Sequence, residues 1–216
     1  MAAERALKRR HVHKFGGSSL ADPVCYRRVA SILEQQAEQQ GGGRELVVVS
    51  AAGKTTNRLI QLVELAEAGD EAAGEAITAL HAYQQSLIDG LLEGELLLDL
   101  SQQLTDDMQQ IAKTLDGQFD RFERNGLLAF GEVWSARLLA ALLTSRGDKA
   151  IWLDARSFLR AEDGAITGTP EEVIEQLRGY AAAGVEEVMM QWISLDDIEG
   201  ITVLAEEVLP HFASEG

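Results

Sequence analysis

The feature that most constrains the fold of this 216-residue chain is a short apolar run at 45–50, Glu-Leu-Val-Val-Val-Ser. Successive residues of a strand point to opposite faces of the sheet, so consecutive branched apolar residues predict a strand that is buried on both faces. Such a strand needs cover on each side, which helices supply. Helices that alternate with strands along the rest of the chain supply this cover, and together they predict an α/β protein with a mainly parallel sheet.

The rest of the pattern agrees with this class. Residues 11–15 predict a second short strand, and Asp22-Pro23 predicts a helix start with the aspartate as N-cap. The other elements expected from periodicity and caps are helices over about 57–124, 129–146, 170–183 and 196–209, and strands at 150–153 and 187–192. The last helix is expected to stop at Pro210, and residues 162–169 are expected to form a loop.

Composition excludes several classes. The chain is 46% apolar and 25% charged, as in ordinary globular proteins. A formal charge of −16 argues against general binding to nucleic acids or anionic membranes. The one cysteine, Cys25, excludes an internal disulfide and a multi-cysteine zinc site, and no metal ligands are assigned. No secretory signal and no continuous apolar membrane span are found, so the expected location is cytoplasmic.

The charge is spread unevenly along the chain. Residues 1–162 carry 18 basic and 23 acidic residues, whereas residues 163–216 carry one basic and 12 acidic residues. Such a shift suggests two segments of different origin. We therefore expect a division into 1–162 and 163–216.

The first candidate site follows the strand at 11–15. Gly16, Gly17 and Ser18 form a turn whose backbone N–H groups can point at an anion, and Lys14 can reach a phosphate. The glycine spacing differs from that of a Walker A loop. A plain turn without a ligand is the alternative interpretation.

The second and third candidates also lie at strand and helix ends. Small and hydroxyl residues from Ser50 to Thr56 follow the buried run, at the place where open α/β sheets bind ligands. Helix capping is the alternative role for these threonines. Glu132 lies near a helix start and could hold an ammonium group, or could simply be an acidic first-turn residue favoured by the helix dipole.

Together these motifs resemble one family. Lys-Phe-Gly-Gly-Ser-Ser-Leu-Ala, Val-Val-Val-Ser-Ala-Ala-Gly-x-Thr-Thr-Asn, Gly-Glu-Val-Trp-Ser-Ala-Arg-Leu and Trp-Leu-Asp-Ala-Arg match, in order and spacing, the N-terminal part of the aspartokinase catalytic domain within the amino-acid kinase superfamily. The resemblance covers about 11–162. The third motif is most like that of methionine-branch bifunctional aspartokinase/homoserine dehydrogenases.

The resemblance implies an aspartate kinase that transfers the γ-phosphoryl group of ATP to the β-carboxylate of L-aspartate with Mg²⁺. It implies a three-layer αβα sheet of the amino-acid kinase type, incomplete here, and possible homo-oligomers. The residues it implies are Lys14, Gly16, Gly17 and Ser18 for the ATP phosphates, with Lys14 catalytic, and Ser50, Thr56 and Glu132 for aspartate.

Residues 167–210 resemble instead the C-terminal end of luciferase-like flavin or deazaflavin oxidoreductases. They are expected to form a helix–strand–helix appendage, and their working role is expected to be an acidic module that completes a sheet. The Thr-Gly-Phe-Ile-like strand and the Leu-Gly-Arg-Gly-Gly-Ser-Asp-like loop of the kinase family do not occur, so the kinase activity of this chain is expected to be impaired. A luciferase-like oxidoreductase fragment and a non-catalytic ligand-binding module are the alternative functions.

Overall fold

A computed structural model describes residues 12–39, 46–154, 161–162, 165–166, 169–182, 187–191 and 202–212. Several residues used in the sequence analysis lie outside the described residues; they are His11, Glu45, Ala155, Arg156, Trp192 and residues 196–201.

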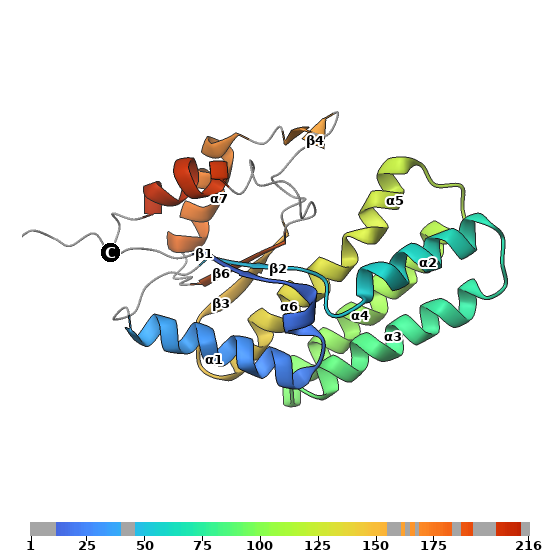
Figure 1. The fold of residues 1–216 in the computed structure, drawn as a ribbon, viewed down its shortest axis with the longest axis horizontal. Coiled ribbons are helices and arrows are strands. Elements are labelled where there is room, and N and C mark those ends of the chain that lie inside the picture. Colours follow the sequence, from blue (N-terminus) through green and yellow to red (C-terminus); the bar gives the residue numbers. More distant parts are fainter. Residues whose placement is uncertain are drawn as a thin grey trace, which may run out of the picture.

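The centre of the fold is a four-stranded parallel sheet (Figure 1). Its order is β1 (Val12–Phe15), β2 (Leu46–Val49), β6 (Glu187–Gln191) and β3 (Ala150–Leu153). All four side chains of β2 are at most 5% exposed, which confirms the expected strand buried on both faces. The sheet thus places the carboxyl ends of β1 and β2 side by side, which is where the first two candidate motifs begin.

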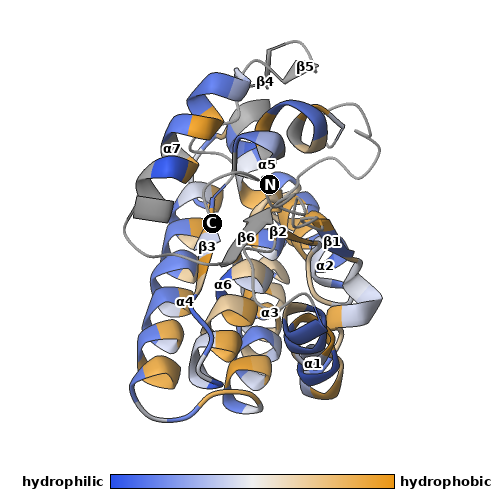
Figure 2. Ribbon diagram, turned by 90° about the vertical axis from the view of Figure 1, so that its left-hand side faces the viewer, coloured by the Kyte–Doolittle hydropathy of each residue, from blue (hydrophilic) through white to orange (hydrophobic). Residues whose placement is uncertain are grey.

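Helices cover both faces of the sheet, as Figures 1 and 2 show from two directions. On one face lie α1 (Pro23–Gln39) and α6 (Phe130–Ser145). On the other face lies α7 (Pro170–Ala182), with the short helical turns η3 (Leu204–Val208) and η4 (Leu209–Phe212). The expected three-layer αβα arrangement is confirmed.

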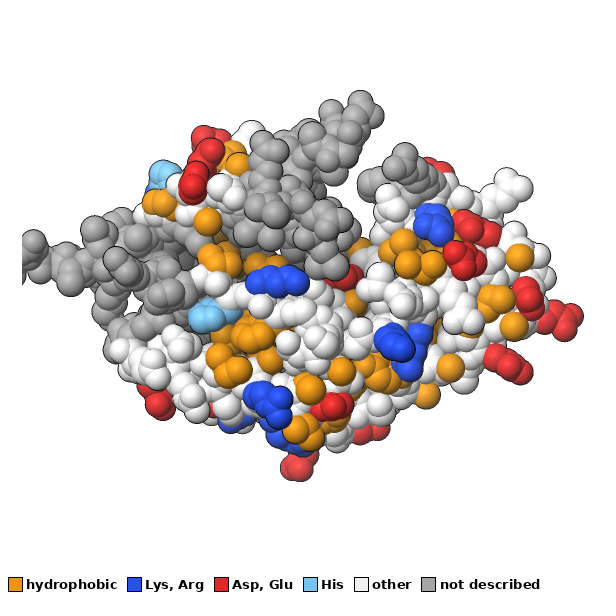
Figure 3. Space-filling model, in the orientation of Figure 1, with side chains coloured by type: hydrophobic (Ala, Val, Ile, Leu, Met, Phe, Trp, Pro, Cys, Tyr) orange, Lys and Arg blue, Asp and Glu red, His pale blue; other side chains and the backbone are white. Residues whose placement is uncertain are grey.

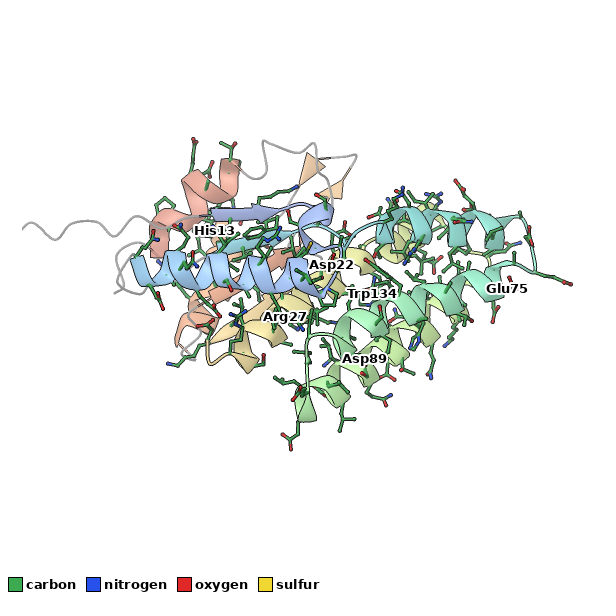
Figure 4. The ribbon with its side chains drawn as sticks, turned by 60° about the horizontal axis from the view of Figure 1, so that its bottom comes forward. His13, Asp22, Arg27, Glu75, Asp89 and Trp134 are labelled. Atoms are coloured by element: carbon green, nitrogen blue, oxygen red, sulfur yellow. The ribbon has the colours of Figure 1, made fainter. Side chains whose placement is uncertain are left out.

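Four helices extend the fold to one side of the sheet (Figure 1). They are α2 (Thr55–Glu67), α3 (Ala73–Asp89), α4 (Gly94–Leu115) and α5 (Arg121–Leu128). Figure 4 places Glu75 toward the end far from the sheet, and Figure 3 shows acidic side chains gathered at that end. In contrast, Asp22 and Trp134 lie where the extension meets the sheet layers (Figure 4).

Helix α6 is the core of the molecule. Twelve of its sixteen residues are buried, because the sheet, α1 and the extension surround it. By length and mean hydropathy, Glu123–Ser145 could cross a membrane, but 78% of its most apolar window is buried inside the fold. Its apolar character is therefore explained by packing in the core.

The C-terminal segment 163–216, called the tail below, contributes β6, a central strand, to the sheet. The N–H and C=O groups of β6 pair with β2 on one side and β3 on the other, so this strand of the expected appendage completes the sheet of the preceding segment. Within the expected loop, β4 (Ala161–Glu162) and β5 (Ala165–Ile166) form a small antiparallel pair. The assignment of 167–210 to a luciferase-like family, and the division at residue 162, stay predictions.

The end of the tail differs from expectation. Residues 202–212 are helical through Phe212 and do not stop at Pro210. Pro210 lies in the first turn of η4, where a backbone N–H is not needed, so the proline does not end the helical run.

The expected helix starts are confirmed. Asp22 Oδ1 accepts a 2.8 Å hydrogen bond from the N–H of Cys25, which caps α1. At α7 the N–H of Glu172 donates to Thr169 Oγ1, and the N–H of Thr169 donates to Glu172 Oε2, both at 3.3 Å. This reciprocal pair is a capping box.

Candidate functional site

The loop after β1 turns tightly into the short helix η1 (Gly17–Leu20). The N–H of Ser19 donates to the carbonyl of Gly16 at 2.9 Å, and the side chains of Lys14 and Ser18 are exposed. The ammonium nitrogen of Lys14 would lie 3.9 Å from a Cβ placed on Gly16, so the lysine curls over the turn. The ammonium group of Lys14 and the turn at Gly16–Ser18 therefore lie together at the surface.

The loop after β2 lies directly against this turn. The N–H of Ser50 donates to the carbonyl of Phe15 at 3.0 Å, and the N–H of Gly53 donates to the carbonyl of Gly17 at 2.8 Å. A Cβ on Gly17 would approach the carbonyl oxygen of Ala51 to 2.6 Å, so the close contact requires glycine. The first two candidate motifs are thus one continuous surface.

The two threonines at the start of α2 have different environments. Thr55 is fully buried; its hydroxyl donates to the carbonyl of Ala52 at 2.7 Å and accepts from Gln84 Nε2 at 2.8 Å. Thr56 is half-buried on the following position of α2. Thr55 therefore holds the loop in place, and Thr56 is the threonine with exposed surface.

Glu132 reaches the same loop from the first turn of α6. Its Oε1 accepts a 3.3 Å hydrogen bond from the N–H of Ala51, and the residue is only 7% exposed. The approach depends on Gly131, where a Cβ would lie 2.7 Å from Cβ of Ala51. Ser50, also 7% exposed, precedes Ala51 at the end of β2. The third candidate motif therefore joins the other two.

The electrostatic state of Glu132 follows from its burial. Loss of hydration raises the pKa of the Glu132 carboxyl above its usual value, and backbone hydrogen bonds, including that from Ala51, partly oppose the rise. In the part of the chain that the structure describes, no Lys or Arg forms an ion pair with this carboxylate. A ligand that brings a positive group would compensate the lost hydration.

A buried polar network connects α6 to α4. Asp107 Oδ2 on α4 accepts hydrogen bonds from Trp134 Nε1 at 2.9 Å and from an Arg137 guanidinium nitrogen at 2.5 Å. The guanidinium also lies 4.6 Å from the ring centre of Trp152. Trp134 and Arg137 belong to the third motif, so part of that motif serves packing. The sequence analysis missed Asp107, although a charged residue within the apolar stripe of α4 is a visible signal.

Two further residues missed by sequence reasoning reach the loops from α3. Tyr83 donates from its hydroxyl to the carbonyl of Ala21 at 3.0 Å, and Gln84 donates to Thr55 as described above. No sequence signal marks them, because both lie in an ordinary helical pattern.

The described residues offer little to a resident metal ion. No group of three or more His, Cys, Asp or Glu side chains that could hold one occurs among them.

Known proteins match the chain along most of its length. A model of the amino acid kinase family matches residues 9–202. Bifunctional aspartokinase/homoserine dehydrogenase 2 of Escherichia coli K12 is 42% identical over 163 residues, and lysine-sensitive aspartokinase 3 of the same organism is 28% identical over 152 residues. These alignments cover 76% and 70% of this chain.

Solved structures of an aspartokinase also resemble this chain. E. coli aspartokinase III in complex with aspartate and ADP, in its R-state, superposes with a TM-score of 0.66 at 25% identity over 83% of this chain. The T-state complex of the same enzyme with lysine and aspartate gives a TM-score of 0.67 at 26% identity. The chain spans 40% of the length of these structures, and 20% and 32% of the two curated relatives.

Proposed function

Because the chain belongs to the amino acid kinase family, we propose that its candidate site binds ATP and L-aspartate and serves transfer of the γ-phosphoryl group to aspartate. The observation that carries this proposal is the junction of three motifs. The turn with Lys14, the loop with Ala51 and the carboxylate of Glu132 meet at one edge of the sheet. The names of the relatives support aspartate as the amino acid.

The nucleotide phosphates are assigned to the turn after β1. Backbone N–H groups of Gly16, Gly17 and Ser18, together with the ammonium of Lys14, would supply positive charge to the phosphate oxygens. Lys14 is exposed and on a flexible stem, so it can follow the phosphoryl group as negative charge develops on it.

Aspartate is assigned to the neighbouring loop. Its ammonium group would pair with Glu132, whose carboxylate is desolvated and without a cationic side chain among the described residues. Ser50 lies at the start of the loop and Thr56 in the first turn of α2, and both would contact the rest of the substrate. Among these, Glu132 has the strongest physical argument, because a bound ammonium compensates its burial.

The protein would catalyse this reaction mainly by aligning ATP and aspartate, and it would form no covalent bond to either substrate. An oxygen of the aspartate β-carboxylate attacks the γ-phosphorus, the bond from phosphorus to the bridging oxygen breaks, and ADP leaves. The protein holds two anions in line and neutralises charge on the phosphoryl group. Mg²⁺ would bind together with ATP and would help to neutralise charge on the phosphate oxygens. A cytoplasmic location and self-association stay expectations.

Calorimetry on the 216-residue chain tests the proposal. We expect the wild-type chain to bind both MgATP and aspartate. Lys14→Ala should lose MgATP binding but keep aspartate binding, whereas Glu132→Ala should lose aspartate binding but keep MgATP binding. Hydroxylamine trapping of aspartyl phosphate then reports turnover. Failure of wild type to bind either ligand would overturn the proposal, as would an equal loss of both ligands in both variants.

A further inference from the structure

The two loops of the site are both held by adjacent residues of α3, Tyr83 and Gln84. We infer that these residues are positioning residues, Tyr83 for the nucleotide loop and Gln84 for the aspartate loop. The inference rests on the proposed function for the identity of the ligands. The loop contacts themselves are independent of it.

Tyr83 fixes the end of the first loop. Its hydroxyl donates a 3.0 Å hydrogen bond to the carbonyl of Ala21, directly after η1. The Arg58 guanidinium stacks on the Tyr83 ring at 4.1 Å from its centre and holds the ring in place. Partial burial raises the pKa of the phenol, so the hydroxyl stays protonated and able to donate.

Gln84 fixes the second loop from within the core. It is 4% exposed, and its amide donates to Thr55 Oγ1 at 2.8 Å. The single hydroxyl proton of Thr55 is already given to the carbonyl of Ala52, so residue 84 must be the donor in this pair. Ala52 follows Ala51, whose N–H binds Glu132. A series of contacts therefore connects Gln84 to the carboxylate of Glu132, the proposed partner of the substrate's ammonium group.

The arrangement explains how a helical extension outside the sheet can serve the site. Neither side chain needs to touch a ligand, because each hydrogen-bonds to the backbone or a side chain of one loop. The Tyr83 hydroxyl also lies against Gly53 of the second loop, but its hydrogen bond, which Tyr83→Phe removes, goes to the first loop. Since the net value of a hydrogen bond is small, loss of one should change affinity about threefold to tenfold. The effect should be selective for one ligand in each variant, whereas a purely structural role would weaken both ligands equally.

The chain offers a matched control. Gln85 is the next residue of α3, and its amide donates to Asp89 and Ser101, away from both loops. Gln85→Met therefore repeats the substitution Gln84→Met without releasing a site loop. Thr55→Val removes the acceptor of the Gln84 bond from the other side and serves as a second variant should Gln84→Met fail to fold.

The test combines hydrogen exchange, without ligands, and calorimetry with MgADP and aspartate. Tyr83→Phe should speed exchange over 17–22 and weaken MgADP about threefold to tenfold. Gln84→Met should speed exchange over 51–56 and weaken aspartate to a similar extent, and Thr55→Val combined with Gln84→Met should be no worse than the stronger single variant. Gln85→Met should change neither the exchange of the two loops nor the affinity for either ligand.

Unchanged exchange in both loops, or equal weakening of both ligands in both variants, would overturn the inference. If wild type binds neither ligand but the two loops still respond selectively in exchange, the proposed function fails while the assignment of Tyr83 and Gln84 to the loops stands.

Discussion

The backbone N–H of Ala51 donates a 3.3 Å hydrogen bond to Glu132 Oε1, and thereby joins the end of β2 to the first turn of α6. These residues are 81 positions apart in the sequence. The contact brings a desolvated carboxylate to the loop that follows β2, whose four residues are all buried. The proposed aspartate site depends on that junction.

Glu132→Gln should separate stability from binding. The amide keeps an oxygen that can accept from Ala51 but carries no charge, so aspartate affinity should fall about 10- to 100-fold in calorimetry through loss of a charge-assisted contact. A variant that binds aspartate as wild type does would remove Glu132 from the site.

The same variant should be more stable than wild type at neutral pH. A raised pKa means that the folded state binds the Glu132 proton more tightly than the unfolded chain, so this group lowers stability as pH rises above its unfolded value of about 4.5. The advantage of Glu132→Gln in thermal midpoint should therefore shrink as pH falls below that value. A larger advantage at low pH would contradict the burial argument.

Gly17→Ala should damage the nucleotide loop, whereas Gly16→Ala should be tolerated by the fold. A Cβ at 17 meets the carbonyl of Ala51 at 2.6 Å, while one at 16 has Lys14 Nζ as its nearest neighbour, at 3.9 Å. We expect Gly17→Ala to cost about 1–3 kcal/mol in urea unfolding and to lose MgADP binding. Equal stabilities for the two variants would show that the loops do not touch as described.

Asp107→Ala should destabilise the fold strongly, because it leaves Trp134 Nε1 and the Arg137 guanidinium without their shared acceptor in the core. Removal of one partner of a buried ion pair costs about 3–5 kcal/mol. Asp106→Ala is the matched control, since Asp106 is exposed and accepts only from Gln102 among its described hydrogen bonds. It should cost no more than about 0.5 kcal/mol. Similar denaturation midpoints would refute the network.

Met189→Pro tests the place of the tail in the fold. Residue 189 lies in β6 between Val47 and Trp152, so a proline there removes an N–H from the centre of the sheet. We expect a loss of about 1–3 kcal/mol or more in unfolding free energy, with Met189→Val close to wild type. A tail that hangs outside the sheet would tolerate both changes.

The α/β class, most element positions and the helix caps could be predicted from the sequence, because they depend on local signals. Consecutive apolar residues at 46–49 and the pair Asp22-Pro23 are examples. The place of β6 could not be predicted in this way. Its pairing with β2 and β3 is a contact between distant segments, and no local pattern specifies it.

The candidate site was predicted in part for the same reason. Lys14, Ser50 and Glu132 follow strand and helix ends that are visible in sequence, and the structure brings them to one edge. Tyr83 and Gln84 act through contacts to loop residues that lie 62 and 29 positions away, respectively, so only the fold identifies them.

The most direct test of the proposed site is backbone amide NMR of the chain during separate titrations with MgADP and aspartate. We expect MgADP to shift the amide signals of Gly16, Gly17 and Ser18, and aspartate to shift those of Ala51 and Glu132. Each set should stay unshifted in the matching variant, Lys14→Ala or Glu132→Gln. Shifts confined to other parts of the molecule, or no shifts at saturating ligand, would contradict the proposed site.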